Sequence, residues 1–392
     1  MQRRTFINII GGGVVLAATG AVVTTQLRSG FPAAAIADWA GPSTSEPDVR
    51  RWALGYAILA PNPHNLQPWI VDLSQTNTIT LYYDRARMLP HTDPLGRQVL
   101  IGHGCFLELL ALALAERGMA CDITLFPNGE FGAALTDFDT RPVARITLRA
   151  GASKDPLFAQ ILHRHTPKAA FDTTRAVTPE TLTQLQTALP TPSTGMQFGA
   201  VREPAQVEAL RKLAMDAARV EFETERTMME SIRLIRIGPD EITRHRDGIS
   251  INSAFVRFAS TVGLFNRTEF PQPGSTGHKQ AIERYAVSTR TAAAFVWLAT
   301  TGNTRSTQVS AGRAYARLQL AATAAGVGMH PLSQALQEFT EMRPHYEAVH
   351  RALLGKVPDA PTDSTLQMLC RVGHAAEVGP TPRRGVAAII RA

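Results

Sequence analysis

The chain has 392 residues, 44% of them hydrophobic, so it can bury a sizeable core and hold two domains. Its formal net charge is +7, but Arg3, Arg4 and Arg28 lie in residues 1–37, which contain no acidic residue, and the rest of the chain carries only +4. No run of Lys or Arg alternates with aromatic residues, which argues against nucleic-acid binding.

The first residues, MQRRTFINIIGGGVVLAATGAVVTT, place a twin arginine before an apolar stretch, residues 9–23, that is short for a membrane span. Ala35-Ile36-Ala37 then fits an A-x-A cleavage pattern. The segment resembles a twin-arginine signal, whose pathway exports folded proteins. We therefore predict that residues 1–37 are a leader, that the protein is periplasmic or in the cell envelope, and that a cofactor is loaded before export. An uncleaved anchor or a chance basic start is the alternative.

Along the rest of the chain, the sequence predicts helices mixed with non-consecutive strands. The apolar periodicity predicts a helix over 47–60 with Ser45 as its cap, and a helix over 95–117 closed by Gly118. Beyond residue 151 it predicts a helix over 307–325 ended by Gly326. The other predicted helices are 155–164, 178–188 and 204–236, and the predicted strands are 68–73, 78–84, 121–126, 143–149, 292–299 and 366–375. This is an α+β pattern, not a regular βαβ repeat.

The two halves echo each other. Residues 96–119, GRQVLIGHGCFLELLALALAERGM, and residues 311–329, AGRAYARLQLAATAAGVGM, are both Gly-Arg starts to long helices that end at glycine and methionine. A duplicated unit and convergent helix chemistry both explain the match.

A stiff loop and two basic segments carry the chemistry. Residues 60–69, APNPHNLQPW, hold three prolines, which fix three φ angles and remove three backbone donors, around a histidine and three amide side chains. Residues 164–168 place Arg164, His165, Thr166 and Lys168 within five positions, a set that suits a phosphate and sugar-like hydroxyls. Near the end, GPTPRRGV (379–386) adds Arg383 and Arg384. Taken alone, each basic segment is also typical of a solvated turn or tail.

Together these segments resemble the flavin-dependent nitroreductase family. RHTPKAAFD (164–172) is similar to that family's Arg-x-Ser-x-Arg/Lys motif with its aromatic-Asp turn, and APNPHNLQPW is similar to its A-P-S-x-x-N-x-Q-P-W loop. AAGVGMHP (324–331) and RVGHAAEVGPTPRR (371–384) resemble its helix end and its closing strand with an arginine tail. The Asn loop precedes the Arg motif here, an order that resembles the Acg-like branch, in which two units are fused. The resemblance thus implies a nitroreductase-like α+β fold of two halves, 38–152 and 153–392, that form an intramolecular pseudo-dimer.

The same resemblance implies one flavin mononucleotide (FMN) site made from both halves. Arg164, Thr166 and Lys168 would hold the phosphate and ribityl chain with His165 against the ring system, and Arg383 and Arg384 would complete the phosphate site. Asn62 and Asn65 would meet the ring from the loop, and the backbone of residues 331–334, including Ser333 and Gln334, would pass near flavin N5. The first half has no Arg motif and the second has LPTPSTGMQFGAV (189–201) in place of the loop, so one site is expected. No partner chain is needed for it, and a monomer or a weak homodimer is predicted.

Residues 220–285 depart from the family's pattern and carry a Met-rich run. In the Acg-like branch such an insert resembles a lid over the flavin, and a helical pair that packs on the core is the alternative. No metal site, P-loop, Rossmann fingerprint or catalytic acid or base is identifiable. The cysteines Cys105, Cys121 and Cys370 form no CxxC motif and are typical of small buried apolar residues. Two functions stay open: hydride transfer between an electron donor and a nitro, quinone or similar small conjugated substrate, or flavin storage without turnover.

Overall fold

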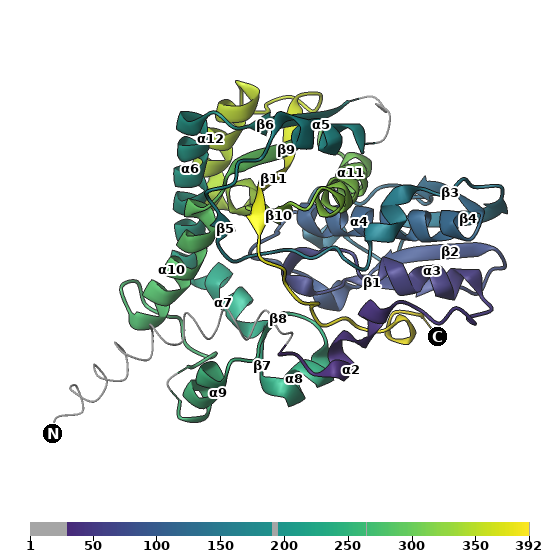
Figure 1. Cartoon of the computed structure of the whole chain (residues 1–392), viewed down its shortest axis with the longest axis horizontal. Helices are drawn as coiled ribbons and strands as arrows, with labels where there is room; N and C mark the ends of the chain where they lie inside the picture. Colours follow the sequence, from purple (N-terminus) through teal and green to yellow (C-terminus); the bar gives the residue numbers. More distant parts are fainter. Residues whose placement is uncertain (1–29, 190–194, 264, 392) are drawn as a thin grey trace.

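A computed structural model describes residues 30–189, 195–263 and 265–391 (Figure 1). The described chain mixes helices with two separate antiparallel sheets and one short parallel strand pair. The α+β class predicted from the sequence is therefore confirmed. Residues 1–29, which contain the twin arginine, lie outside the described part of the chain.

The first sheet belongs to the chain before residue 151. Its strands are β1 (Trp69–Asp72), β2 (Thr78–Tyr83), β3 (Met119–Leu125) and β4 (Ala144–Ala150), in the antiparallel order β1-β2-β4-β3. Its helices and 3-10 turns are α2 (Ala33–Ile36), η1 (Ala37–Ala40), α3 (Val49–Ala57), η2 (Pro63–Asn65), η3 (Arg85–Arg87), α4 (Arg97–Glu116) and η4 (Leu135–Asp137). All four strands predicted in this region are present, and Gly118 follows α4 with the left-handed φ of 72° that the sequence implied.

The second sheet uses strands from the rest of the chain. They are β6 (Met196–Val201), β9 (Ala294–Thr301), β10 (Gly328–Pro331) and β11 (Ser364–Ala375), in the order β10-β11-β9-β6, with β5 (Phe171–Asp172) paired to β11. The associated helices and 3-10 turns are η5 (Pro156–Gln160), α5 (Pro179–Thr187), α6 (Pro204–Glu223), α10 (Thr276–Arg290), α11 (Arg305–Ala324), η6 (Gln334–Leu336), η7 (Thr340–Met342), α12 (Arg343–Leu354) and η8 (Val386–Ala388). Between α6 and α10 lie α7 (Glu225–Arg233), β7 (Ile235–Ile237), α8 (Gly238–His245), β8 (Ile249–Ile251) and α9 (Ala254–Thr261).

Three local predictions were wrong. Asp48, not Ser45, caps α3, because its carboxylate accepts the N–H of Arg50. Residues 155–164 form only the 3-10 turn η5, since a run this short does not nucleate a helix by itself. The helix predicted over 204–236 breaks at Thr224, where the backbone is extended at ψ 112°.

Helices α4 and α11 cross at two glycines, one on each helix. A Cβ on Gly104 would lie 2.0 Å from the carbonyl oxygen of Val309, and one on Gly312 would lie 1.9 Å from that of Ile101. The contacts are reciprocal, as at an interface with a two-fold axis. The two halves therefore meet like the subunits of a dimer within one chain.

The helix register corrects the repeat read from the sequence. Arg97 and Arg305 each begin a helix of 20 residues, and Gly118 and Gly326 follow the two helices with φ of 72° and 67°. These two pairs and the crossing glycines share one spacing along the chain. The sequence match aligned the Gly-Arg pair at residue 96 with the pair at residue 312. In the structure the equivalent of residue 312 is Gly104, about two helical turns further along α4.

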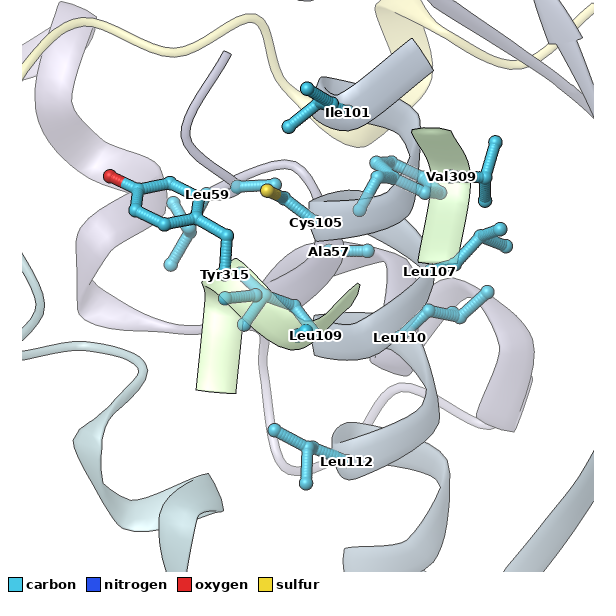
Figure 2. Packing of buried hydrophobic residues seen from close by; sticks show 14 of the residues in the cluster. Ala57, Leu59, Ile101, Cys105, Leu107, Leu109, Leu110, Leu112, Val309 and Tyr315 are labelled. Atoms are coloured by element: carbon cyan, nitrogen blue, oxygen red, sulfur yellow. The ribbon is translucent and has the colours of Figure 1, made fainter. Parts of the chain in front are cut away.

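Helix α4 is long and apolar enough to cross a membrane, with a mean hydropathy of 1.7, but 83% of that stretch is buried inside the fold. Its leucines pack against α3, the first sheet and α11 (Figure 2). Burial of this kind identifies α4 as the central core helix.

The C-terminal tail crosses from the second half to the first. After β11, the N–H of Val71 in β1 donates to the carbonyl oxygen of Ile389 at 2.8 Å, and the N–H of Arg391 donates back to that of Val71 at 2.8 Å. This crossing carries Arg383 and Arg384 to the loop at residues 60–69.

Candidate functional site

The loop at residues 60–69 has a strained backbone. Three residues of the loop have left-handed φ angles, a region that residues other than glycine seldom adopt: His64 at 50°, Asn65 at 54° and Gln67 at 54°. Each such residue costs about 1–3 kcal/mol and persists only where its surroundings hold it. Here the Asn62 side chain accepts the N–H of Gln67 at 2.8 Å and donates to the carbonyl oxygen of Ala60 at 3.0 Å. Asn62 thus fixes the loop's shape from inside.

Arg164 is buried beside this loop, with an exposed fraction of 2%. Its Nη1 donates to Oε1 of Gln319 at 2.9 Å and its Nη2 to the carbonyl oxygen of Leu59 at 3.0 Å. Its Nε has no hydrogen-bond partner among the described residues. Burial lowers the pKa of Arg164, because no nearby carboxylate offsets the loss of water.

Arg383 approaches the same carbonyl group from the tail. Its Nη2 donates to the oxygen of Leu59 at 3.2 Å and its Nη1 to Oδ1 of Asn65 at 2.7 Å, while its Nε also lacks a partner within the described chain. Burial and the charge of Arg164 lower the pKa of Arg383 to about 9. Two guanidinium groups therefore converge on one neutral oxygen, and the charge of Asp38 favours the charged form of Arg383.

Thr166 and His165 extend the cluster. Gln319 on α11 links the motif, since its Nε2 donates to Oγ1 of Thr166 at 3.1 Å while its Oε1 accepts from Arg164. The ring of His165 lies 4.7 Å from that of Trp39, and burial, followed by the charges of Arg164 and Arg383, lowers the pKa of His165 to about 4. The imidazole is therefore neutral at pH 7.

Sequence reasoning missed Trp39 and Gln319. The guanidinium carbons of Arg164 and Arg383 lie 5.6 Å and 5.2 Å from the centroid of the Trp39 ring, which is a cation–π arrangement. Trp39 lies two residues after the predicted leader and Gln319 is one polar residue on a long helix, so neither carried a recognisable signal. Ala35 is also buried, and its carbonyl oxygen accepts the N–H of Arg383 at 3.0 Å.

Lys168 belongs to a neighbouring set of basic groups. The protein atoms around Lys168 take water from its ammonium group and so lower its pKa, although part of the side chain is exposed at the surface. Its charge also lowers the pKa values of His64 and His330, after the larger effect of burial, and for His64 the value is about 4. Arg371, fully buried, donates to Nδ1 of His330 at 3.0 Å.

Ser333 and Gln334 follow β10 at the start of η6. Oε1 of Gln334 accepts the hydroxyl of Tyr285 at 2.7 Å, and Nε2 of Gln337 donates to the buried carboxyl of Glu221 at 3.0 Å. Burial raises the pKa of Glu221 to about 7, although the hydrogen bond from Gln337 favours its charged form.

Arg384 does not join Arg383. Its backbone N–H donates to Oε1 of Gln67 at 2.8 Å, and its guanidinium donates to the carbonyl oxygens of Gln67 and Ala388, 3.9 Å from the Asp84 carboxylate. The Asn65 side-chain amide hydrogen-bonds the tail: it donates to the carbonyl oxygen of Pro382 at 3.0 Å and accepts from Arg383. The structure thus gathers Asn65, Arg164, His165, Thr166 and Arg383, and directs Arg384 to another surface.

The insert is bonded to the loop. Nε2 of His64 lies 2.9 Å from Oγ of Ser231 on α7, and the N–H of Gly248 donates to the carbonyl oxygen of Asn65 at 3.2 Å. The Glu230 carboxylate accepts the backbone N–H groups of His91 and Thr92 at 3.0 Å and 2.8 Å. The Met-rich run packs within the insert, as Met228, Met229 and Ile232 form a small cluster with Phe222, Ile235, Phe270 and Ala281.

This site has the chemistry of an anion receptor. Buried guanidinium groups with an unpaired N–H each are costly unless an acceptor reaches them. Arginine presents its donors in a fork that matches phosphate oxygens, and the neighbouring hydroxyl of Thr166 suits a polyol. Within the described ranges, no three His, Cys, Asp or Glu side chains group closely enough to hold a metal ion.

Comparison with known proteins gives relatives that include proteins named putative nitroreductases. No family model matches the chain. A protein of Mycobacterium tuberculosis (strain CDC 1551 / Oshkosh) named "Putative NAD(P)H nitroreductase acg" is 34% identical over 128 residues, which cover 32% of this chain and 36% of that protein. The match thus spans about a third of that relative's length. A second protein of the same strain, named "Putative NAD(P)H nitroreductase MT3217", is 25% identical over 373 residues, which cover 91% of this chain and 96% of that protein.

Two solved structures with detectable similarity are named FMN-dependent nitroreductases. An FMN and NADPH-dependent nitroreductase, NfnB, from a Sphigopyxis strain has 18% identity and a TM-score of 0.36 over 61% of this chain and 99% of its own. The FMN-dependent NfnB of Mycobacterium smegmatis in complex with NADPH has 20% identity and a TM-score of 0.36 over 58% and 94%. The chain is thus similar in sequence to proteins named putative NAD(P)H nitroreductases, and the second match runs almost end to end.

Proposed function

We propose that the chain is an FMN-binding oxidoreductase of the nitroreductase type, in which two fused halves of the Acg-like branch build one flavin site. The supporting observation is the pair Arg164 and Arg383, which meet at the carbonyl oxygen of Leu59 with one unpartnered Nε each. One guanidinium comes from the motif of the second half and the other from the tail that crosses to the first.

The residues present fit FMN. A phosphate would supply acceptors to the two unpartnered Nε atoms and would offset the positive charge that lowers the pKa of Arg383. Thr166, oriented by Gln319, offers a hydroxyl to the ribityl chain. The loop backbone beside the site is fixed by the Asn62 side chain before any ligand binds, which lowers the entropy cost of binding.

Bound FMN would supply the redox chemistry, with a hydride passing to or from a nitro, quinone or similarly conjugated substrate. The chain's own part is positioning and electrostatics. Neutral His64 and His165 offer no acidic proton at pH 7, because burial lowers the pKa of each to about 4. The buried positive groups favour any bound molecule that gains negative charge on reduction. The relatives' names make a reduced nicotinamide the first electron donor to test.

Anaerobic photoreduction tests the proposal. The purified protein should carry one FMN per chain, released by acid and quantified against protein. After photoreduction it should be reoxidised by nitroaromatics or quinones faster than free FMN is under the same conditions. Two flavins per chain, or no binding after reconstitution, would contradict a single site made from both halves.

Flavin storage is the second candidate, and the contacts of the insert favour it. The insert reaches the loop through Ser231 and Gly248, so it is placed to cover a bound ring. Replacing residues 225–275 by a short Gly/Ser bridge should then speed oxidation of the reduced protein by bulky quinones and affect the reaction with dioxygen less. Equal quinone rates would exclude a lid, and loss of flavin would assign the insert to the binding site and favour storage.

We further propose that residues 1–37 direct export by the twin-arginine pathway to the periplasm or cell envelope. Ala35 packs on the site and accepts the N–H of Arg383, so a peptidase would act only on a chain in which this contact is open. The protein reaches its membrane through this leader alone and works as a monomeric pseudo-dimer or a weak homodimer. Mass spectrometry of the exported protein tests cleavage after Ala37.

A further inference from the structure

A second basic hollow lies on the outer side of the loop, where the insert, the tail and η3 meet. It encloses about 450 Å³, within the usual range for small-ligand pockets. Arg87 comes from η3, residues 243–247 from the end of α8, and Arg384 with Gly385 and Ala388 from the tail. Arg383 and Arg384 are neighbours in the chain, but their side chains serve the inner cluster and this outer pocket respectively.

Positive charge in this pocket exceeds the negative charge available. Asp247 lies 2.6 Å from Arg87 and 3.0 Å from Arg236, and Asp84 lies 3.1 Å from Arg87 and 3.9 Å from Arg384. Both carboxylates are therefore shared between arginines already.

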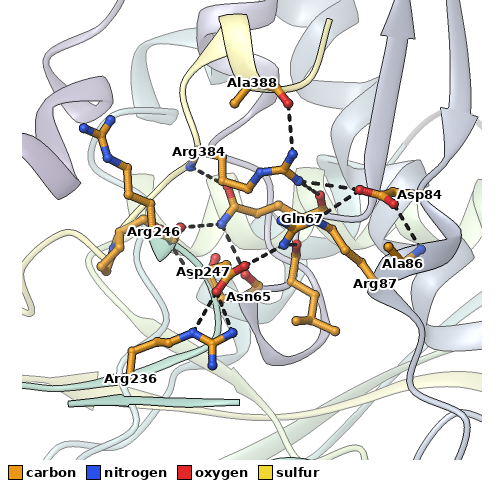
Figure 3. Close-up of polar contacts among 12 residues, drawn as sticks. Asn65, Gln67, Asp84, Ala86, Arg87, Arg236, Arg246, Asp247, Arg384 and Ala388 are labelled. Carbon is orange, nitrogen blue, oxygen red and sulfur yellow. Dashed lines mark hydrogen bonds and ion pairs between the residues drawn. The ribbon is translucent and has the colours of Figure 1, made fainter. Parts of the chain in front are cut away.

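Arg244 and Arg246 stand outside these pairs. Neither has a carboxylate within ion-pair distance among the described residues, and Nε of Arg246 donates only to the carbonyl oxygen of Thr243 at 3.3 Å. Figure 3 shows the Arg246 guanidinium directed away from Asp247. Arg244 and His245 lie in the last turn of α8, where cations suit the helix dipole, but that effect does not account for Arg246 and Arg384.

One buried side chain holds both walls of the pocket. Gln67 is fully buried; its Oε1 accepts the N–H of Arg384 at 2.8 Å, and its Nε2 donates to the carbonyl oxygen of Arg246 at 2.8 Å (Figure 3). Arg246 has a left-handed φ of 52°, and Gly248 follows where a Cβ would lie 2.3 Å from the oxygen of Leu234. The arginines are thus presented by a backbone that is fixed before any ligand arrives, which lowers the entropy cost of binding.

We propose that this pocket binds a phosphate-bearing small molecule with at least two anionic groups, a nucleotide or inorganic pyrophosphate, separate from the flavin site. Several arginine forks around one hollow match a polyphosphate better than a single small anion. Burial and the charge of Arg87 lower the pKa of Arg384, so a bound anion would stabilise that guanidinium. The proposal uses none of the contacts of Arg164 and Arg383 and stands without the proposed function.

Isothermal titration calorimetry with pyrophosphate tests the pocket, at constant ionic strength and with FMN in excess so that the inner cluster is filled. The variant Arg244→Glu/Arg246→Glu should bind pyrophosphate about 100-fold more weakly, at about tenfold for each charge-assisted contact. The control Arg145→Glu/Arg149→Glu makes the same change of net charge at two exposed positions on β4 and should stay within about threefold of wild type. Arg244→Lys/Arg246→Lys keeps the charge without the fork and should bind with intermediate affinity, which also guards against misfolding of the Glu variant.

ADP titrated in parallel identifies the source of the phosphates: tighter binding of ADP assigns a nucleotide, tighter binding of pyrophosphate an inorganic ligand, and either result supports the site. Three results would overturn it. Sulfate could bind as tightly as pyrophosphate, or the control pair could lose as much affinity as the pocket pair. Pyrophosphate could also bind in a parallel titration without FMN and fail to bind in the titration with excess FMN, which would place the anion in the inner cluster.

Discussion

Substitution of Gly104 by alanine probes the contact on which the two-half architecture depends. The new Cβ would lie 2.0 Å from the carbonyl oxygen of Val309 and 2.8 Å from Cα of Gly312, whereas ordinary contact begins at 3.4 Å. Both neighbours are backbone atoms of α11, so α4 and α11 must move apart along their whole contact. Overpacking of this kind costs about 3 kcal/mol, and the helix propensity of alanine returns about 1 kcal/mol. The free energy of unfolding should therefore fall by about 2 kcal/mol.

Urea unfolding followed by tryptophan fluorescence and circular dichroism measures this change. Gly312→Ala, the symmetry mate, should cost a similar amount, and the double variant should cost less than the sum because one displacement relieves both clashes. Gly277→Ala in α10 is the matched control, because the new Cβ would meet only the Pro271 side chain, at an ordinary contact distance of 3.6 Å. This substitution should leave the free energy of unfolding unchanged or raise it slightly. A Gly104→Ala protein as stable as wild type would refute the close crossing and the pseudo-dimer built on it.

Three further outcomes are expected. Arg164→Ala/Arg383→Ala should weaken FMN binding by about 100-fold or more in a flavin-fluorescence titration, because two charge-assisted contacts at about 1.5–3 kcal/mol each are lost. Arg384 faces the outer pocket, so Arg384→Ala should change the FMN affinity by no more than a few fold. Because burial raises the pKa of Glu221 from 4.5 to about 7, the folded chain holds a proton that the unfolded chain releases, so stability should fall as pH rises from about 4.5 to about 7. Glu221→Gln should flatten that part of the urea-midpoint profile, and an unchanged slope would assign it to another group. Arg3→Lys/Arg4→Lys should leave a flavin-loaded precursor in the cytoplasm on fractionation, and normal export of that variant would reject the twin-arginine leader.

Local sequence chemistry determined most of the elements. The long helices α4 and α11, their closing glycines and the strands of the first sheet follow from apolar periodicity and from the left-handed φ at Gly118 and Gly326. These are properties of neighbouring residues. The same local reading failed at Thr224, where the Thr227 hydroxyl donates to the carbonyl oxygens of Glu221 and Thr224 as the helix breaks, and sequence periodicity does not register this hydrogen-bond competition.

Tertiary structure alone decided how the site is assembled. The sequence singled out Arg164, Arg383 and Arg384 as cations, but only the crossing of the tail directs Arg383 inward to Leu59 and Arg384 outward to Gln67. Adjacent residues in an extended segment point to opposite sides, and which side faces the loop depends on the register of the tail against β1.

Trp39 and Gln319 show the same limit. Each is far along the chain from the motif that it contacts, and the energy that places it, cation–π packing for one and a two-ended amide bridge for the other, exists only after the halves have met. Residue type and local spacing therefore determined which chemistry the chain contains. Long-range packing around α4 and α11 decided which of those groups share a site.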